Sequence, residues 1–579
     1  AEGETSDGAE LAKLFTEAKA GEAGSGDVTV TLAKNYDLTN YGWTSLTVDG
    51  YHGAGIVTVE GNGHTITGLN APLFAGGFAG TSGIVIKNLT LTGVKIEDSA
   101  NSQGIGAFIN NVDSMPKIEL DNCHLTNSKI TSTGGARVGG LIGWTSGYNK
   151  KDDGPVDTYI TVKNCSVENT EITANGSVGG IIGHAGCNPA TFHTFTDNTV
   201  TDCKLNSTDV GSWRVGVVVG TANVGEVTIT GTKESNNTLT QTGKTAPEGQ
   251  SNLYGRFVPN GTGKLVIDDE ASFGTDYVAA VGTNGYKTVA AAVAEADGKT
   301  VTLLKDVTEN VVIPADKTVT LDLNGKTLTV TTDRGIQVKG KLTVTGNGTV
   351  TCTKTPFMVD AGELVIENGA VNSESDYGIY AKNGGQITVN GGTLTSSFAV
   401  LSGNNTTGDM NFTVNGGTLT SKLSEAIYMP GQQTLIINGG VINGGISARM
   451  GQITVNGGVI NGMTASQTAD AMKDYYNYSG SAWIGDAIYV WGGTYNSDNA
   501  NGNKTNLTIN GGTINGNAHR AIAIYDIGTY YEQEISVNIS NANVSGDVVL
   551  DKTYGNHTHN VTTNISITGG YFTSDPSAY

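Results

Sequence analysis

The chain has 579 residues and a net charge of −21, only 15% of its residues are charged, and glycine alone occupies 83 positions. The acidic balance argues against nucleic acid as a partner, because phosphates are bound by clustered lysine and arginine. It also argues against electrostatic docking on anionic membranes. No apolar run approaches the roughly 20 residues of a membrane span, so we expect no direct membrane insertion.

The first residues give an expectation about location. The chain begins at Ala1 rather than Met, with the small and acidic segment 1–4. Such a start is typical of a secreted protein whose signal peptide has been removed. We therefore expect an extracellular or cell-surface protein.

The first predicted element is a helix from Asp7 to about Ala20. Asp7 and Glu10 have the spacing of a capping box. The apolar face of this helix contains Leu11, Leu14, Phe15 and Ala18. An alternating strand at 28–32 follows. Because the first coil of a solenoid otherwise exposes apolar core and unpaired backbone, we expect the helix to cap one.

Two motifs then recur through the N-terminal half. The first is Ile-Lys-Asn-Leu-Thr-Leu at 86–91, with related segments at 120–125 and 162–167. The second is Val-Gly-Gly-Leu-Ile-Gly at 138–143, repeated in related form at 178–183 and 215–220, at steps of 40 and 37 residues. If these coils stack, the asparagines of the first motif should form a hydrogen-bonded ladder. Cys123 and Cys165 would then be buried inward-facing thiols rather than a disulfide.

A second helix followed by a strand predicts a second solenoid. This helix runs from about Thr288, a suitable N-cap, to Ala296, and the strand is at 301–304. Its apolar face contains Val289, Ala292, Val293 and Ala296. The acidic segment 268–270 precedes it, so we divide the chain into domains 1–275 and 276–579.

The C-terminal half contains six copies of a four-residue motif: a branched aliphatic residue, then Asn or Thr, then Gly-Gly. The copies begin at Val389, Val414, Ile437, Val455, Ile509 and Ile567. The first four are 25, 23 and 18 residues apart, and looser versions extend the series backward through Leu323, Val344 and Ile366. A short strand and a tight turn at such steps indicate a solenoid. A turn glycine such as Gly457 is expected at positive φ, and the break at 463–485 is interpreted as an insertion.

The Val-Gly-Gly segments at 138–143 and 178–183 resemble the GLUG motif of bacterial surface proteins, which include adhesins and non-catalytic parts of IgA-specific metallopeptidases. The second half resembles the Asn-Gly-Gly-rich right-handed parallel β-helix repeats of surface proteins from gut bacteria, and 569–576 is similar to their closing coil. The resemblance implies an all-β fold of two right-handed parallel β-helices, pectin-lyase-like in the second, at the cell surface. No His-Glu-x-x-His motif is present, so protease activity is not implied.

Pectin-lyase-like β-helices include polysaccharide lyases and glycoside hydrolases, so paired carboxylates at equivalent coil positions would point to catalysis. A second apolar row lies 13 residues beyond the strand anchors, and two residues before it stand Tyr377, Glu425, Asp486 and Arg520. If these positions stack, Glu425 and Asp486 lie about 10 Å apart, near the ~6.5–9.5 Å of an inverting pair. A polysaccharide-cleaving enzyme using Glu425, Asp486, His519 and Arg520 is one hypothesis. The other is a solvated row of charges, and the familiar polygalacturonase motifs are absent.

Aromatic residues gather where the repeat is interrupted. The candidate ligand-binding residues are Tyr475, Tyr476, Tyr478, Trp483, Trp491, Tyr525, Tyr530 and Tyr531. Insertions between coils often form binding surfaces, and Tyr and Trp suit stacking on sugar rings. Alternatively, these rings pack against the solenoid flank. We expect any ligand at 463–495 and the adjoining coil at 519–531.

These observations favour a secreted or cell-surface protein that binds a glycan, or a host or neighbouring-cell surface, without catalysis. The alternatives are a polysaccharide lyase or glycoside hydrolase and a passive surface stalk. We expect a monomer with no cofactor. We also expect no metal site, because no cysteine pair has zinc-site spacing. The scattered histidines should instead be hydrogen-bonded within turns; they are His64, His124, His184 and His193.

Overall fold

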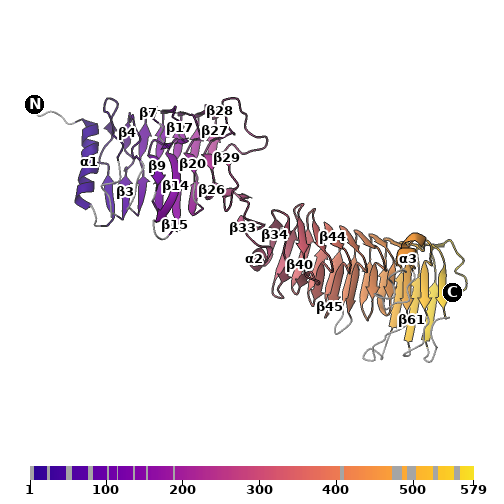
Figure 1. Cartoon of the computed structure of the whole chain (residues 1–579). Helices are drawn as coiled ribbons and strands as arrows, with labels where there is room; N and C mark the ends of the chain where they lie inside the picture. The colour runs from indigo at the N-terminus through magenta and orange to yellow at the C-terminus, as the bar shows by residue number, and fades with distance from the viewer. Residues whose placement is uncertain are drawn as a thin grey trace, which may run out of the picture. The chain divides into compact units, whose positions relative to one another are not determined.

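The computed structural model describes residues 6–22, 26–46, 55–75, 82–100, 103–113, 115–134, 137–150, 154–186, 189–404, 410–471, 485–491, 504–525, 533–552 and 561–579. Within them the chain is mostly strand, with three short helices and largely parallel sheets (Figure 1), so the all-β prediction is confirmed. The chain divides into two compact units, Ala1–Asp276 and Tyr277–Tyr579. The boundary inferred from the sequence lies one residue earlier. No helix in these segments is long and apolar enough to cross a membrane.

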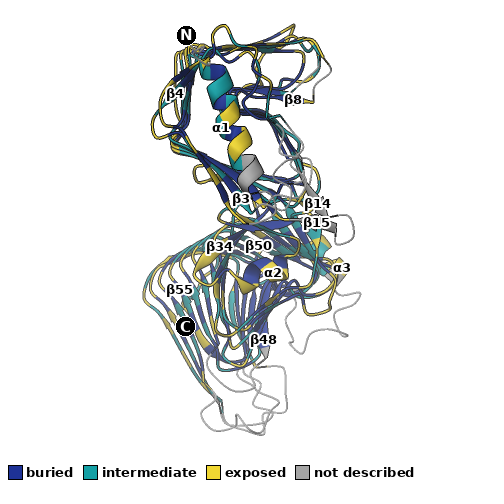
Figure 2. Cartoon of the chain, turned by 90° about the vertical axis from the view of Figure 1, so that its left-hand side faces the viewer, coloured by how far each residue is buried: buried dark blue, intermediate teal, exposed yellow. Residues whose placement is uncertain are grey.

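Helix α1 (Asp7–Glu22) stands where the sequence predicts it and lies across the end of the first unit (Figure 2). Its own residues Leu11 and Phe15 are buried. The Phe15 ring meets Phe74 edge-on, with 5.8 Å between the ring centroids. The helix therefore covers apolar side chains that the first coil would otherwise expose to water.

The capping box expected between Asp7 and Glu10 is wrong. The hydroxyl of Ser6 accepts the hydrogen bond from the Ala9 N–H, at 3.3 Å, so the cap lies one residue earlier. Asp7 and Glu10 instead both bind Lys34 Nζ, at 2.9 and 2.8 Å. These two acidic residues thus tie the helix to the coil below it.

Helix α2 (Val289–Ala294) caps the second unit, and the predicted N-cap is confirmed. The Thr288 side chain accepts a hydrogen bond from the Ala291 N–H at 3.1 Å. The carboxylate of Glu309 accepts the N–H groups of Val289 and Ala290, at 2.7 and 2.9 Å. A carboxylate placed against free N–H groups at a helix start is favoured by the helix dipole.

Helix α3 (Ala465–Ala471) was not expected from the sequence. The sequence feature that would have indicated this helix is a capping box formed by Thr464 and Gln467. The Thr464 N–H donates to Gln467 Oε1 at 2.9 Å, and the Gln467 N–H donates to Thr464 Oγ1 at 3.4 Å. The helix lies in the segment interpreted as an insertion.

The first unit contains five sheets. The nine-stranded sheet runs from β1 (Val28–Thr31) to β31 (Glu270–Phe273), the seven-stranded sheet from β2 (Tyr36–Asp37) to β27 (Lys233–Ser235), and the five-stranded sheet from β7 (Lys95–Asp98) to β28 (Thr238–Gln241). The four-stranded sheet contains β8 (Gly104–Ile105), β13 (Arg137–Gly139), β19 (Val178–Gly179) and β24 (Val215–Gly216). The six-stranded sheet contains β9 (Ile109–Asp113), β14 (Ile142–Lys150), β15 (Gly154–Val156), β20 (Ile182–Ala185), β25 (Val219–Ala222) and β29 (Tyr254–Phe257). Successive strands of the chain enter these sheets in rotation.

The second unit contains three sheets. The 13-stranded sheet runs from β33 (Asn284–Tyr286) to β64 (Val561–Ile567), and the 11-stranded sheet from β35 (Val307–Thr308) to β65 (Tyr571–Phe572). The ten-stranded sheet contains β36 (Val312–Ile313), β39 (Ile336–Val338), β42 (Phe357–Asp360), β45 (Ile379–Lys382), β48 (Leu401–Asn404), β51 (Ile427–Met429), β54 (Ile446–Ala448), β57 (Ile488–Trp491), β60 (Ile522–Tyr525) and β63 (Val548–Asp551). From β34 (Lys299–Leu303) onward, each sheet takes every third strand.

In-register pairing stacks the predicted strand anchors into one buried apolar column. The column contains Ile366, Val389, Val414, Ile437, Val455 and Ile509. Full burial of such a side chain contributes about 1.5–3 kcal/mol. The series is wrong at Leu323, because Val344 pairs with Leu321. It also omits Ile539, which pairs with Ile509 in a coil that lacks the Gly-Gly pair.

The expected position of the turn glycine needs a correction of one residue. Gly458, not Gly457, has positive φ, at 84°. Gly457 is required for another reason: a Cβ there would lie 2.6 Å from the carbonyl oxygen of Asn438 in the preceding coil. The two glycines of the repeat therefore serve different purposes, close approach for the first and backbone conformation for the second.

Asparagine ladders follow the turns of both units. In the second unit the ladder contains Asn390, Asn415, Asn438, Asn456 and Asn510, and each of the last four donates from Nδ2 to the Oδ1 of the one before, at 2.8–3.0 Å. In the first unit, Asn122 donates to Asn88 at 2.9 Å, whereas Asn164 donates to Asp121 at 3.0 Å. The ladder predicted for the first unit is thus confirmed at one step and displaced to a neighbouring acceptor at the next.

Replacing Asn438 by Ala should lower the free energy of unfolding by about 1 kcal/mol, because two net hydrogen bonds of the ladder are lost. Chemical denaturation of the full chain measures this. Asn372→Ala is the matched control, since the Asn372 side chain makes no hydrogen bond among the described residues. Equal effects of the two substitutions would show that the ladder adds nothing to stability.

Four cysteines, Cys123, Cys165, Cys203 and Cys352, are buried free thiols, so the expectation for the first two is confirmed. Burial raises the pKa of Cys123 well above its usual range and the pKa of Cys203 to about 11. The thiols of Cys123 and Cys203 are therefore protonated and have little nucleophilic character. Cys187 lies outside the described residues.

Candidate functional site

The row predicted beyond the strand anchors is present in the ten-stranded sheet. Its members Ile379, Ile427, Ile488 and Ile522 are joined by in-register pairs through Leu401 and Ile446. Ile488 keeps this register although residues 462–487 separate β57 from β56 (Val459–Asn461), which marks that segment as additional to the repeat. Glu425 and Asp486 consequently lie two coils apart, and Asp486 and Arg520 lie on adjacent coils.

Asp486 is held in a bidentate ion pair. Arg520 donates from Nε to Asp486 Oδ1 at 2.8 Å and from Nη2 to Oδ2 at 2.9 Å. The Asp486 side chain is fully buried. Burial disfavours the charge of Arg520, but the hydrogen bonds and the charge of Asp486 outweigh it and raise the pKa of Arg520 above its usual range. Both oxygens of this carboxylate are therefore engaged by the guanidinium.

The other two residues of the enzyme hypothesis are His519, which is half-buried, and Glu425. The ring of His519 is hydrogen-bonded through Nε2 to the Thr468 hydroxyl of α3, at 2.5 Å, so it joins the helix to the coil. Glu425 is 2% exposed. Burial, with a contribution from the charge of Glu425, raises the pKa of Tyr377 to about 12.

Two of the eight aromatic candidates lie in the described segments. Trp491 and Tyr525 are 2% and 7% exposed, and each ring faces a guanidinium. Arg449 lies 4.6 Å from the Trp491 ring, and Arg520 lies 5.2 Å from the Tyr525 ring. In this arrangement one of the protein's own cations covers a face of each ring.

The remaining aromatic candidates lie outside the described residues. They are Tyr475, Tyr476, Tyr478, Trp483, Tyr530 and Tyr531. Their part of the binding hypothesis stays a prediction.

The four histidines expected to be hydrogen-bonded all have partners within the first unit. His64 bonds to Asn35 at 3.3 Å and His124 to Ser166 at 2.8 Å, while His184 and His193 bond to Arg137 and Thr145, at 3.2 and 2.6 Å. Within the described segments, no group of three or more His, Cys, Asp or Glu side chains is arranged to hold a metal ion.

A different candidate site lies in the first unit, where the four-stranded and six-stranded sheets meet. We call this meeting line the corner. Its glycines are Gly143, Gly183, Gly220 and Gly255. A Cβ on Gly183 would lie 2.5 Å from the Arg137 carbonyl carbon, and one on Gly220 would lie 2.8 Å from the Val178 nitrogen. Only glycine lets the two strands approach this closely.

This contact brings two columns of side chains together. The first column precedes the motif valines and contains Arg137, Ser177 and Arg214; the second follows the corner glycines and contains Trp144, His184, Thr221 and Arg256. Arg137 and Ser177 of the first column each contact the residue one coil further on in the second. Arg137 Nε donates to His184 Nδ1 at 3.2 Å, and the hydroxyls of Ser177 and Thr221 are 2.7 Å apart.

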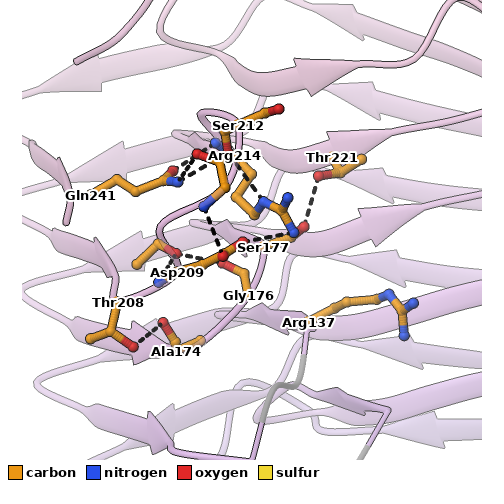
Figure 3. A network of polar contacts seen from close by, with 12 residues as sticks. Arg137, Ala174, Gly176, Ser177, Thr208, Asp209, Ser212, Arg214, Thr221 and Gln241 are labelled. Atoms are coloured by element: carbon orange, nitrogen blue, oxygen red, sulfur yellow. Dashed lines mark hydrogen bonds and ion pairs between the residues drawn. The ribbon is translucent and has the colours of Figure 1, made fainter. Parts of the chain in front are cut away.

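The columns line a polar pocket of about 560 Å³, which we call the arginine pocket. Its cations are Arg137, Arg214 and Arg256, and Asp209 is the one carboxylate among its described lining residues. Arg214 is fixed by a 2.9 Å ion pair to Asp209 and by Gln241, whose Oε1 accepts its backbone N–H at 2.9 Å (Figure 3). None of the residues predicted as functional from the sequence lies in this pocket except His184, which was expected only to be hydrogen-bonded. The sequence feature that could have indicated it is an arginine directly before two of the three Val-Gly segments, Arg137 and Arg214.

Electrostatics keep His184 neutral in the arginine pocket. Burial, and then the positive charge of Arg137, lower the pKa of His184 to about 4. Its Nδ1 therefore accepts the hydrogen bond from Arg137 at neutral pH. His193, 1% exposed, has its pKa lowered by burial to about 3.

These two histidines predict acid sensitivity of the first unit. The unfolded chain takes up their protons near pH 6.5, whereas the folded chain takes them up only near pH 4 and pH 3. Their contribution to stability is therefore complete above pH 6.5 and falls progressively below it, by on the order of 3 kcal/mol per histidine. His193→Gln should flatten the decline of the unfolding midpoint between pH 6.5 and 3.5, measured by tryptophan fluorescence. An unchanged slope would contradict this assignment.

Comparison of the chain with protein-family models, curated proteins and solved structures finds no match.

Proposed function

We propose that the protein is a secreted or cell-surface repeat protein of two right-handed parallel β-helices that binds a glycan or another surface ligand without cleaving it. The β-helical part is supported by the rotation of successive strands among stacked parallel sheets, since each return to the same sheet requires a crossover. The right-handed sense is that of nearly all parallel crossovers.

The arginine pocket is the observation that carries the binding function. Its volume of about 560 Å³ falls in the range of small-molecule sites. Guanidinium groups, hydroxyls and the amides of Asn175 and Asn223 converge on it. A set of hydrogen-bonding groups that lines a polar pocket suits a saccharide, whose surface is largely hydroxyl.

The state of the carboxylates favours binding over cleavage. Glycoside cleavage by a carboxylate pair requires one acid and one base that both reach the sugar. Asp486 is bound by Arg520 through both oxygens, and Asp209 in the arginine pocket is bound by Arg214 at 2.9 Å. Each of these carboxylates already has an internal partner.

A glycan array and a reducing-sugar assay on plant and mucin polysaccharides, both with the full chain, test the proposal. Binding without product is the expected result. Release of product would overturn it in favour of a polysaccharide lyase or glycoside hydrolase. Neither binding nor product would overturn it in favour of a passive stalk.

A further inference from the structure

The arginine pocket contains two cations that no carboxylate of the described residues neutralises. Arg214 is paired with Asp209. Arg137 stacks on Trp144, with its guanidinium 4.8 Å from the ring, and donates to the neutral His184. Arg256 makes no hydrogen bond or ion pair with any described residue. Such a concentration of positive charge is unusual in a chain of net charge −21.

The position of Arg256 places it beside another arginine. The corner pairs each residue of the first column with the next coil of the second, as Arg137 with His184 and Ser177 with Thr221. By the same offset Arg214 is the counterpart of Arg256, because a Cβ on the adjoining Gly255 would contact the Arg214 backbone. Like charges at neighbouring positions repel each other, and a bound anion removes this repulsion.

The chemistry of the pocket selects among anions. A guanidinium presents a planar fork of donors that matches a carboxylate. Asp209 lies in the same pocket and repels added negative charge, which disfavours a phosphate dianion more than a monoanion. The amides of Asn175 and Asn223 provide donors and acceptors for neighbouring hydroxyls.

We propose that the arginine pocket binds the carboxylate of an acidic sugar residue, with Arg256 as its principal partner and Arg137 adding positive charge. This assignment rests on the proposed glycan-binding function and specifies its ligand class. The Arg214 backbone is held by Gln241 and its side chain by Asp209 before any ligand arrives, so little ordering is required on binding.

The test is an array that carries uronate-containing, sialylated, sulfated and neutral glycans, probed with the full chain and its Arg256→Gln variant. We expect carboxylated glycans to bind and Arg256→Gln to weaken binding about tenfold or more. Converting the carboxylate of the best ligand to its methyl ester should have a similar effect. Arg256→Lys should recover only part of the affinity, because it restores the charge but not the fork.

Lys233→Gln is the matched control, since it removes an exposed cation outside the arginine pocket. Its affinity should equal that of the parent, and the unfolding midpoints of all variants should agree. Binding of only neutral or only sulfated glycans would overturn the carboxylate assignment and leave the glycan-binding function standing. So would carboxylate binding that Arg256→Gln leaves unchanged. Absence of binding to any glycan would overturn the function and the assignment together.

Discussion

Replacing Asp486 by Ala is expected to lower the free energy of unfolding by about 3–5 kcal/mol. The substitution leaves the Arg520 guanidinium in a largely buried place without the carboxylate that receives its two strongest hydrogen bonds. Its remaining partners, Tyr525 and the more distant Asp551, replace little of that interaction. Chemical denaturation of the full chain measures the loss.

Glu534→Ala is the control for this experiment. It removes an ion pair of similar length, 2.9 Å to Lys504, whose side chains are 40% and 54% exposed. We expect a loss of at most about 1 kcal/mol there. Adding Arg520→Met to Asp486→Ala should recover part of the stability, because the unpaired cation is then gone. If Asp486→Ala instead left stability unchanged or raised it, as is common for catalytic residues, the enzyme hypothesis would regain support.

Replacing Gly458 by Ala is the second substitution with a large expected effect. Gly458 has φ 84°, where a residue with a Cβ costs about 1–2 kcal/mol. In addition, the new Cβ would lie 2.9 Å from the carbonyl oxygens of Gly439 and Gly440 in the preceding coil. Overpacking against backbone that cannot move aside costs about 1–3 kcal/mol more.

Gly298→Ala separates these two effects. Gly298 also has positive φ, 68°, but a Cβ there would meet no atom within 4 Å. Its loss of stability should therefore equal the conformational part alone. If both substitutions lowered the unfolding midpoint equally, close stacking of the coils would not explain the second glycine of the repeat.

The repeat pattern of the second unit was sufficient to predict much of its architecture. A coil buries its inward side chains and exposes its turns, so anchors such as Val389 and Val414 recur at one coil's length. The apolar row through Ile427 and Ile488 follows from the same periodicity. A coil that breaks the motif while keeping the register, as at Ile539, cannot be found in this way.

The arginine pocket could not be predicted from the repeats. Its residues meet across two sheets with an offset of one coil, so Arg137 contacts a residue that lies 47 positions further along the chain. A motif search aligns equivalent positions and does not show which different positions touch. In the same way, Asp486 and Arg520 were expected to be neighbours, but their burial and bidentate pairing depend on side-chain packing that spacing alone does not determine.

At the corner of the first unit, the glycine positions are fixed by the fold, whereas the residues beside them can vary. Glycines such as Gly183 and Gly220 cannot accept a side chain, because the opposite backbone occupies the space. The residues beside them differ from one coil to the next, as Arg137 with His184 and Ser177 with Thr221. In each coil, the residue before the motif valine and the residue after the corner glycine can thus vary while the glycines stay fixed. The side chains along the corner can therefore change one coil at a time, by point substitutions that leave the glycine contacts unchanged.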